Sequence, residues 1–249
     1  MRYFGIVSYK GAHYDGFQRQ KDRPSVQKEI ERVLSFLLGE EILIAGAGRT
    51  DAKVHALGQT FTFDCLKALG PRFLFKANRL LPPDIHLLSI EEKADSFHAR
   101  HSCCGKEYIY RFLPSGKRPF EVETLAQLHR DDFDEARFVE ALNVYKGKHN
   151  FQNFTTKKDD VDSFIRDIWS IDVAYDGEII EVKLRANGFM TYQIRIMLGV
   201  AFKVALRQLE VKDVEEALNR KERRILSFKA PPEGLYLAKV LYEEQYPII

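Results

Sequence analysis

Three side chains suited to acid–base or electrostatic chemistry, Arg49, Asp51 and His55, lie within seven residues of the sequence. The loop that carries them contains Gly46 and Gly48, which permit unusual backbone angles or the close approach of another group. A carboxylate with cationic neighbours, on a loop fixed between two strands, is a way to hold a reactive acid in place. The alternative is structural: an aspartate that caps a turn and pairs with Arg49. On these residues alone both interpretations stay open.

The segments that flank this loop predict the strands that position it. Residues 42–45 are a short apolar run, and Leu57, Phe61 and Phe63 follow the loop at the alternating period of a strand. Two common functions of glycine loops are excluded. A dinucleotide-binding loop needs a glycine where Asp51 stands and a helix after it, and a phosphate-binding loop needs Gly-Lys-Ser/Thr.

Residues 48–56, Gly-Arg-Thr-Asp-Ala-Lys-Val-His-Ala, resemble the active-site motif of the TruA family of pseudouridine synthases. Four further stretches resemble other motifs of that family, in its order and across nearly the whole chain. They are Tyr14–Gln18 followed by Ser25–Gln27; Phe97–Arg100 followed by Lys106, Tyr108 and Tyr110; Ala186–Met190 with Arg195 and Gly199; and Gly234–Leu237 with Val240 and Tyr242. One position departs from the family's active-site motif: Lys53 stands where the family usually has glycine.

The resemblance implies an isomerase that converts uridine to pseudouridine in RNA, without a cofactor or a metal. The C1′–N1 bond of the nucleotide breaks, the base turns, and it rejoins the sugar through C5. This requires a carboxylate beside sugar and base, acting as nucleophile or general base. It also requires the base to leave its stack, at a cost of roughly a few kcal/mol. The implied substrate is tRNA, at positions 38 to 40 of the anticodon stem-loop.

The catalytic residues that the resemblance implies are Asp51, Tyr108 and Arg195. Asp51 is the carboxylate, and whether it attacks the base, attacks the sugar or helps to remove a proton stays open. Arg195 pairs with Asp51 and keeps it ionised, unless it is an ordinary arginine of a helix surface. Tyr108 lies against the uracil with its hydroxyl available for proton transfer, unless it is a core aromatic of its strand.

Four residues are expected to bind the substrate: Arg49, Lys53, Phe189 and Met190. The planar guanidinium of Arg49 suits the space left by the base, or a phosphate beside it. Phe189 and Met190 wall the pocket or belong to the core. Because lysine resists a positive φ, either the backbone at Lys53 is ordinary or Lys53 replaces glycine with a phosphate contact. His55 is expected to fix the loop rather than to catalyse.

The bulk composition is that of a globular protein: 249 residues, 45% hydrophobic and 30% charged, with a net charge of +2. Five local basic clusters offer a phosphate-binding track for RNA. They are Arg19-Lys21-Arg23, Lys117-Arg118, Lys146-Lys148, Lys157-Lys158 and Lys221-Arg223-Arg224. Three cysteines form no disulfide framework. With no signal peptide or membrane-spanning run recognised, the expected location is the cytoplasm.

A possible metal site is disfavoured by the predicted secondary structure. His98, His101, Cys103 and Cys104 follow closely on one another. On the strand predicted there the two histidines point to opposite faces, and vicinal cysteines bind one ion with difficulty. No metal is expected.

Periodicity predicts two successive sets of strands and helices. Strands are expected at 3–9, 85–90, 97–112, 168–175, 178–186 and 235–242, and helices at 26–37, 73–81, 133–145, 189–209 and around 214–218. The first strand is expected to be central, Asp176-Gly177 to turn a hairpin, and helix 189–209 to be amphipathic, with one apolar stripe.

These sets predict an α+β protein of two similar halves. The resemblance implies tandem ferredoxin-like (RRM-like) halves, 1–104 with the catalytic loop and 105–249, whose antiparallel sheets join around a basic cleft. It also implies a homodimer. Three alternatives remain: a pseudouridine synthase paralogue acting on another RNA such as rRNA, a non-catalytic RNA-binding protein, and a hydrolase of N-glycosidic bonds.

Overall fold

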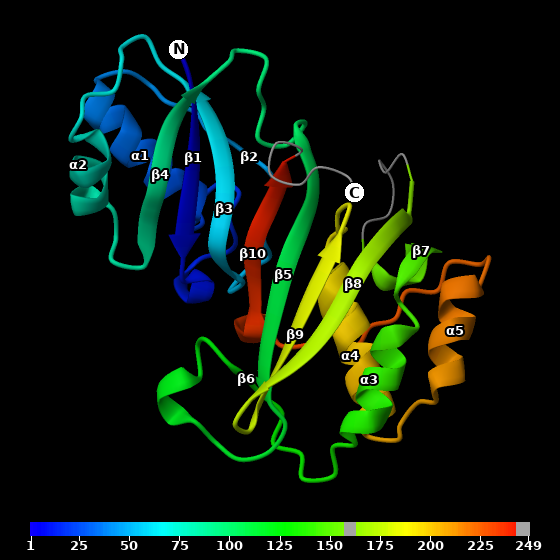
Figure 1. The fold of residues 1–249 in the computed structure, drawn as a ribbon. Coiled ribbons are helices and arrows are strands. Elements are labelled where there is room, and N and C mark those ends of the chain that lie inside the picture. Colours follow the sequence, from blue (N-terminus) through cyan, green and yellow to red (C-terminus); the bar gives the residue numbers. More distant parts are fainter. Residues whose placement is uncertain (157–162, 243–249) are drawn as a thin grey trace. The chain divides into compact units, whose positions relative to one another are not determined.

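The computed structural model describes residues 1–156 and 163–242. Packing divides the chain into two compact units: Met1–Cys104 together with the described residues from Tyr236, and Gly105–Leu235. Both units combine helices with a mostly antiparallel sheet, so the predicted α+β class is confirmed (Figure 1). Ferredoxin-like halves over residues 1–104 and 105–249 stay a prediction.

Helices are interspersed among the strands along the chain. The strands are β1 Arg2–Tyr9, β2 Ala45–Gly46, β3 His55–Asp64, β4 Ile85–Lys93, β5 Cys103–Leu113, β6 Ala126–Gln127, β7 Gly147–Asn150, β8 Ile165–Asp176, β9 Ile179–Ala186 and β10 Leu235–Tyr242. The α-helices are α1 Val26–Leu38, α2 Phe73–Leu80, α3 Glu135–Asn143, α4 Gln193–Ala205 and α5 Val211–Asn219. Short 3₁₀ turns are η1 Gly11–His13, η2 Pro119–Glu121, η3 Gln152–Phe154 and η4 Pro232–Gly234.

In the first unit the strands are ordered β4-β1-β3-β10, and β2 pairs with β3. β1 runs antiparallel to both of its neighbours, which confirms its predicted central place. β10 runs parallel to β3, with Tyr236 opposite His55. The loop that carries Asp51 joins β2 to β3, so its predicted position between two strands is confirmed.

Helix α1 forms where its capping residues and its apolar spacing predict it. The Ser25 hydroxyl accepts a hydrogen bond from the Lys28 amide at 3.4 Å, and Gly39 ends the helix in the left-handed conformation. Val26, Ile30 and Leu34 on its inner face are fully buried. This helix therefore belongs to the core of the first unit.

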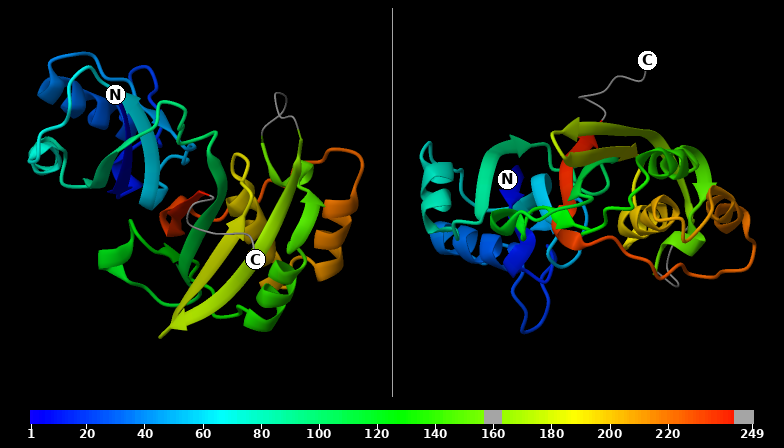
Figure 2. Two further views of the ribbon diagram at one scale, coloured as in Figure 1. Left: turned by 45° about the horizontal axis from the view of Figure 1, so that its top comes forward. Right: turned by 90° about the horizontal axis from the view of Figure 1, so that it is seen from below.

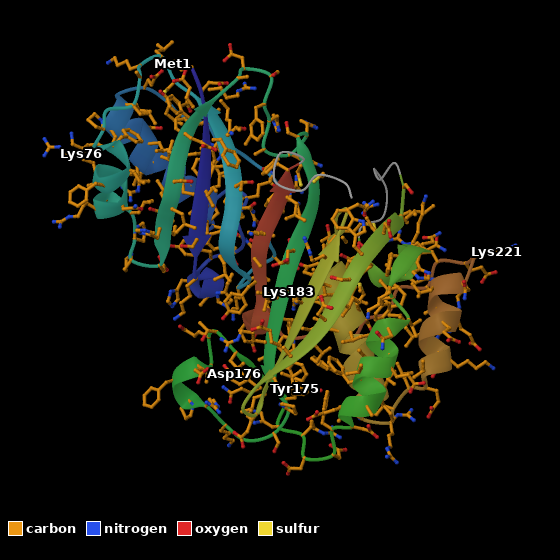
Figure 3. The ribbon with its side chains drawn as sticks, viewed as in Figure 1. Met1, Lys76, Tyr175, Asp176, Lys183 and Lys221 are labelled. Carbon is orange, nitrogen blue, oxygen red and sulfur yellow. The ribbon has the colours of Figure 1, made fainter. Side chains whose placement is uncertain are left out.

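In the second unit the sheet order is β5-β9-β8-β7, all antiparallel, with β6 parallel to β5. Helices α3, α4 and α5 cover one face of this sheet (Figure 2). The predicted hairpin between β8 and β9 is confirmed, and Asp176 lies opposite Ile179 at its end (Figure 3). Its turn contains Gly177 at a φ of +61°.

The core of the second unit is rich in aromatic rings. Phe112 of β5 lies 5.0 Å from Phe202 of α4 and 5.3 Å from Phe138 of α3, measured between ring centroids. Each such pair adds about 0.5–1.5 kcal/mol beyond the burial of area. These contacts fix α3 and α4 against β5.

The predicted amphipathic character of helix 189–209 is wrong. The helix is shorter, Gln193–Ala205, and its residues are buried on nearly every side, with Arg195 and Lys203 half-buried. The helix starts late because Tyr192 has a φ of +60°, in the left-handed region. Phe189 and Met190 therefore lie in the segment before α4.

The predicted strand 97–112 is also too long. Residues 94–102 are mostly turns, and β5 begins at Cys103. The Ser102 amide donates to the His98 carbonyl at 2.9 Å, and the His98 amide donates to the Ser102 hydroxyl at 3.1 Å. These local bonds replace strand pairing in this segment.

Candidate active site

Buried polar side chains form hydrogen bonds that anchor the Asp51 loop. The hydroxyls of Tyr9 and Thr50 hydrogen bond at 2.8 Å, and the Gln59 amide donates to the Gly48 carbonyl at 3.0 Å. Tyr9, Thr50 and Gln59 are all buried, and burial raises the pKa of the Tyr9 hydroxyl far above its ordinary value. The loop is thus anchored just before Asp51, which is itself half-buried.

The segment at 14–18 packs directly on this loop. The Phe17 amide donates to the Thr50 carbonyl at 3.3 Å, and the Lys53 amide donates to the Tyr14 carbonyl at 3.1 Å. Between them Gly16 has a φ of +103°, and a Cβ there would lie 2.5 Å from the Thr50 carbonyl oxygen. Only glycine fits this close approach. The opening motif thus holds the Asp51 loop in place.

Lys53 adopts the backbone conformation that a glycine at this position would favour. Its φ is +65°, so the alternative of an ordinary backbone angle is wrong. A side chain in the left-handed region costs about 1–2 kcal/mol. The Lys53 side chain is exposed, so its ammonium group is presented to solvent. The fold therefore retains backbone strain at Lys53 and presents its exposed ammonium group on the same loop as Asp51.

We expect Lys53→Gly to raise the free energy of unfolding by roughly 0.5–1 kcal/mol, because glycine relieves the strain but adds entropy to the unfolded chain. Lys53→Ala is the matched control, since it removes the ammonium group and keeps the strain. If Lys53 contacts a phosphate, both variants weaken RNA binding and only the glycine variant is stabilised. Equal RNA affinity in both variants and the parent would contradict the contact.

Arg49 and His55 differ sharply in their surroundings. Arg49 is exposed, and no carboxylate in the described part of the chain forms an ion pair with it. The alternative of a structural pair between Arg49 and Asp51 is therefore wrong. His55 is buried, its Nδ1 accepts from the Gly11 amide at 2.9 Å, and its ring stacks on Tyr236 at 4.7 Å. Both contacts agree with the predicted loop-fixing role.

In the second unit the structure brings Tyr108 and Phe189 together. Tyr108, on β5, is 7% exposed, and the edge of one ring meets the face of the other at 5.4 Å between centroids. Met190 is also buried, and its amide donates to the Gln193 side chain at 2.9 Å. The motif before α4 therefore forms an ordered wall next to the tyrosine.

Arg195 is held by the segment that precedes β10. Its Nε donates to the Ala230 carbonyl at 2.9 Å, and the Ala230 amide donates to the Arg195 carbonyl at 2.7 Å. The Arg195 guanidinium lies 5.4 Å from the centroid of the Tyr192 ring, and the Lys229 ammonium lies 4.2 Å from that centroid. A planar guanidinium that is fixed by a hydrogen bond and by an aromatic ring has a defined orientation. Arg195 is therefore a positioned side chain, and an ordinary surface arginine is excluded.

The predicted site residues fall into two groups, one in each unit. Arg49, Asp51 and Lys53 lie on the β2–β3 loop of the first unit. Tyr108, Phe189, Met190 and Arg195 belong to the second unit, on β5, before α4 and within α4.

Sequence reasoning missed several residues that support these groups. They are Tyr9, Gln59, Tyr192, Gln193, Lys229 and Ala230. A polar residue at an inward position of an apolar strand or helix, as with Gln59 and Gln193, is a signal that the sequence offered. Lys229 and Ala230 carry no such signal, since their role follows from the packing of a loop on α4.

His98 and His101 do not point to opposite faces. They lie in the turn before β5 with their rings 4.4 Å apart, so the predicted strand geometry is wrong. The His98 Nδ1 accepts from the amides of Arg100 and His101 at 3.1 and 3.4 Å. Among residues 1–156 and 163–242, no three His, Cys, Asp or Glu side chains are grouped so as to hold a metal.

We expect this turn to lose stability in mild acid. Burial, His101 and nearby arginines lower the pKa of His98 from its ordinary value of 6.5. The stabilising contribution is therefore complete above about pH 6.5 and declines as the pH falls through the folded pKa. The test is urea unfolding of the parent and of His98→Asn at pH 7.5 and at pH 5.0. The asparagine oxygen can accept hydrogen bonds in place of Nδ1 and does not titrate. The free energy of unfolding should therefore fall less between the two pH values in His98→Asn than in the parent. Equal losses would contradict this assignment.

The five basic clusters are placed unevenly in the structure. Lys157-Lys158 lies outside the described residues. The clusters at 146–148 and 221–224 both belong to the second unit, while 19–23 lies in the first. In the described part of the chain, no helix is both long enough and apolar enough to cross a bilayer.

Relatives align with nearly the whole chain. A protein of Geobacillus sp. (strain WCH70), named tRNA pseudouridine synthase A, is 36% identical over 239 residues, covering 95% of this chain and 96% of its own length. A protein of the same name from Neorickettsia sennetsu is 39% identical over 246 residues, covering 97% and 100%.

Two further comparisons are less extensive. A family profile described as tRNA pseudouridine synthase matches residues 141–243. A solved Cbf5–Nop10–Gar1 complex aligns with 94% of this chain and 57% of its own, with 12% identity and a TM-score of 0.40, a likeness too weak to bear on function. The identity and coverage of the relatives confirm the family that the motifs predicted. The chain belongs to the tRNA pseudouridine synthase A (TruA) family.

Proposed function

We propose that this protein isomerises uridine to pseudouridine in tRNA. The observation that carries the proposal is the identity of 36–39% to proteins named tRNA pseudouridine synthase A over at least 95% of the chain. The motif loop with Asp51 supports it, since the loop is anchored by buried hydrogen bonds and presents an exposed arginine beside the carboxylate.

The catalytic residues in this proposal are Asp51, Tyr108 and Arg195. Asp51 supplies the carboxylate, and Arg195 supplies the cation that keeps it ionised, as the motifs imply. Tyr108 lies against the uracil, and the edge-to-face contact of Phe189 with its ring supports an aromatic wall there. The reaction breaks the C1′–N1 bond and forms a C1′–C5 bond, while a proton leaves C5 and another joins N1. Because reactant and product are isomers, the balance needs no oxidant, reductant or nucleotide.

The substrate-binding residues in the proposal are Arg49, Lys53, Phe189 and Met190. Arg49 fills the space that the extruded base leaves, or contacts a phosphate, and its lack of an ion pair within the described residues supports this availability. Lys53 contacts a phosphate near Asp51. Phe189 and Met190 wall the uracil pocket beside Tyr108.

The target uridines in the proposal are those at positions 38 to 40 of the tRNA anticodon stem-loop, which is the role implied by the family. Folded RNA is recognised largely through its shape, phosphates and sugar hydroxyls, so one fold can serve several neighbouring positions. Lys53 is the residue that favours a second candidate, a paralogue acting on another RNA such as rRNA, because it adds a cation where the family usually has glycine.

The fold in the proposal is a pair of tandem ferredoxin-like halves around a basic cleft. The first unit supports it, since β1-α1-β2-β3-α2-β4 has the strand order β4-β1-β3-β2. In the second unit, β5-α3-β8-β9-α4 with the order β5-β9-β8 agrees with the same pattern. We further propose a homodimer, which light scattering on the purified protein tests, and a cytoplasmic location.

The proposed function is tested by product analysis of a tRNA transcript incubated with the purified protein. Isomerisation leaves the mass of the RNA unchanged and produces a nucleoside that elutes as pseudouridine. A hydrolase would release free uracil and lower the mass of the RNA. A non-catalytic RNA-binding protein would bind the transcript and change neither quantity.

A further inference from the structure

Two of the basic clusters, separated by more than 70 residues in sequence, line one cavity in the second unit. The cavity has a volume of about 460 Å³ and lies between the edge strand β7 and the end of α5, elements that pack side by side (Figure 1). Lys148 comes from β7, and Arg220 and Lys221 come from the segment after α5. Figure 3 shows Lys221 beside the end of α5. None of the predicted catalytic or substrate-binding residues contributes to this cavity.

The charged side chains that line this cavity are all positive. Its lining includes Lys148, Arg220, Lys221 and His149, and it contains neither Asp nor Glu. In the described part of the chain no carboxylate forms an ion pair with Lys148, Arg220 or Lys221. Three cations around one hollow repel one another unless an anion lies among them. The lining therefore favours an anionic ligand.

The end of α5 would normally oppose an anion, because the last carbonyls of a helix carry partial negative charge. Here amide side chains hydrogen bond to one of those carbonyls and to the two backbone carbonyls that follow the helix. The Asn153 amide donates to the Ala217 carbonyl at 2.8 Å, and the Gln152 amide donates to the carbonyls of Arg220 and Lys221 at 2.9 and 3.1 Å. These bonds offset part of the partial negative charge of the helix end.

Further hydrogen bonds to Asn153 order the cationic segment before any ligand arrives. Asn153 is fully buried, and its carbonyl oxygens accept from the amides of Arg224 and Leu226 at 2.6 and 3.0 Å. The backbone from 220 to 226 is therefore fixed to η3. A prearranged site loses less entropy on binding than a flexible basic tail would.

We propose that this cavity, lined by Lys148, Arg220 and Lys221, binds backbone phosphate of the RNA substrate. A polyanion fits better than a single free phosphate, because two more cations, Arg223 and the exposed Arg224, follow in the same segment, with Glu222 as the one acidic residue among them. The inference rests on the proposed function, since it takes the ligand to be the RNA that the enzyme modifies. The cavity supplies affinity and takes no part in the chemistry.

The test is the triple variant Lys148→Gln, Arg220→Gln, Lys221→Gln, compared with the parent in tRNA binding at 50–300 mM KCl. Each phosphate that a cation neutralises contributes about 0.7–0.9 to the slope of log K against log salt. We expect the slope to fall by about one or more and the affinity at 100 mM KCl to fall roughly tenfold. Turnover at saturating tRNA should stay within about twofold of the parent.

Lys212→Gln is the matched control, because Lys212 is an exposed lysine of α5 that does not line the cavity. It should leave affinity and slope nearly unchanged. If the parent isomerises tRNA uridines but the triple variant binds with unchanged affinity and slope, the inference is wrong and the proposed function stands. If the parent neither binds nor isomerises tRNA, both are wrong. Saturable binding of inorganic phosphate, lost in the triple variant without loss of tRNA affinity, would show a small-anion site and also overturn the inference.

Discussion

Asp51→Asn is expected to reduce pseudouridine formation in tRNA by at least about a thousandfold. The asparagine side chain has nearly the same size and cannot ionise, so it removes the negative oxygen and leaves the loop anchored through Thr50, Gln59 and Gly48. Affinity for tRNA should stay within about threefold, because phosphate contacts supply most of it. Single-turnover assays with saturating enzyme separate the chemical step from binding.

A matched control for this variant lies on the same loop. Arg49→Gln removes an exposed cation that has no ion pair in the described residues, so the folded loop should tolerate it. We expect Arg49→Gln to weaken tRNA binding or base extrusion and to retain measurable isomerisation. An Asp51→Asn enzyme that turns over at a rate close to that of Arg49→Gln would exclude Asp51 as the catalytic carboxylate.

Arg195→Lys is expected to reduce turnover by at least about a hundredfold although it preserves the charge. The Arg195 guanidinium is directed by its bond to the Ala230 carbonyl and by the ring of Tyr192, and a lysine ammonium has no second planar donor to keep that direction. The loss should appear in kcat more than in KM, because the proposed partner of Arg195 is the Asp51 carboxylate rather than the bulk of the tRNA.

Arg195→Ala separates the two contributions of this side chain, charge and direction. Without a nearby cation the pKa of a carboxylate rises. The acidic limb of the pH profile of kcat should therefore move to higher pH in Arg195→Ala and stay in place in Arg195→Lys. Unchanged thermal melting of the lysine variant shows that the second unit remains folded. A lysine variant with near-normal kcat would contradict the account of a directed guanidinium.

The elements that the sequence predicted well are those with capping and turn residues. Ser25 and Gly39 delimit α1, and the β8–β9 hairpin forms at its Asp-Gly pair. Both signals are local, so they act in any tertiary context. The loop of Asp51 between two strands was predicted for the same reason, since its glycines and its flanking apolar residues are contiguous in sequence.

The errors arose where tertiary packing decides. Helix α4 was expected to have one apolar stripe, but the loop that contains Phe228 and Ala230 covers another side of it. At Gly199 a Cβ would lie 2.6 Å from the Phe228 carbonyl, so this loop reaches the helix backbone itself. Such a contact between segments about 30 residues apart leaves no periodic trace in the sequence.

The site was predicted unevenly for a related reason. The motif positions of Asp51, Tyr108 and Arg195 could be named from sequence, whereas Tyr192 and Ala230, which contact Arg195, could not. Lys53 illustrates the limit. The sequence raised the question of its backbone angle, and only the structure gave the positive φ.

The central claim is that the carboxylate of Asp51 converts tRNA uridines to pseudouridine, and mapping of pseudouridines in total RNA tests it most directly. Cells that lack this protein are compared with the same cells carrying the wild-type chain or Asp51→Asn. The account predicts that pseudouridines at positions 38 to 40 of tRNA disappear without the protein, return with the wild type and stay absent with Asp51→Asn. Identical maps with and without the protein, or full restoration by Asp51→Asn, would contradict it.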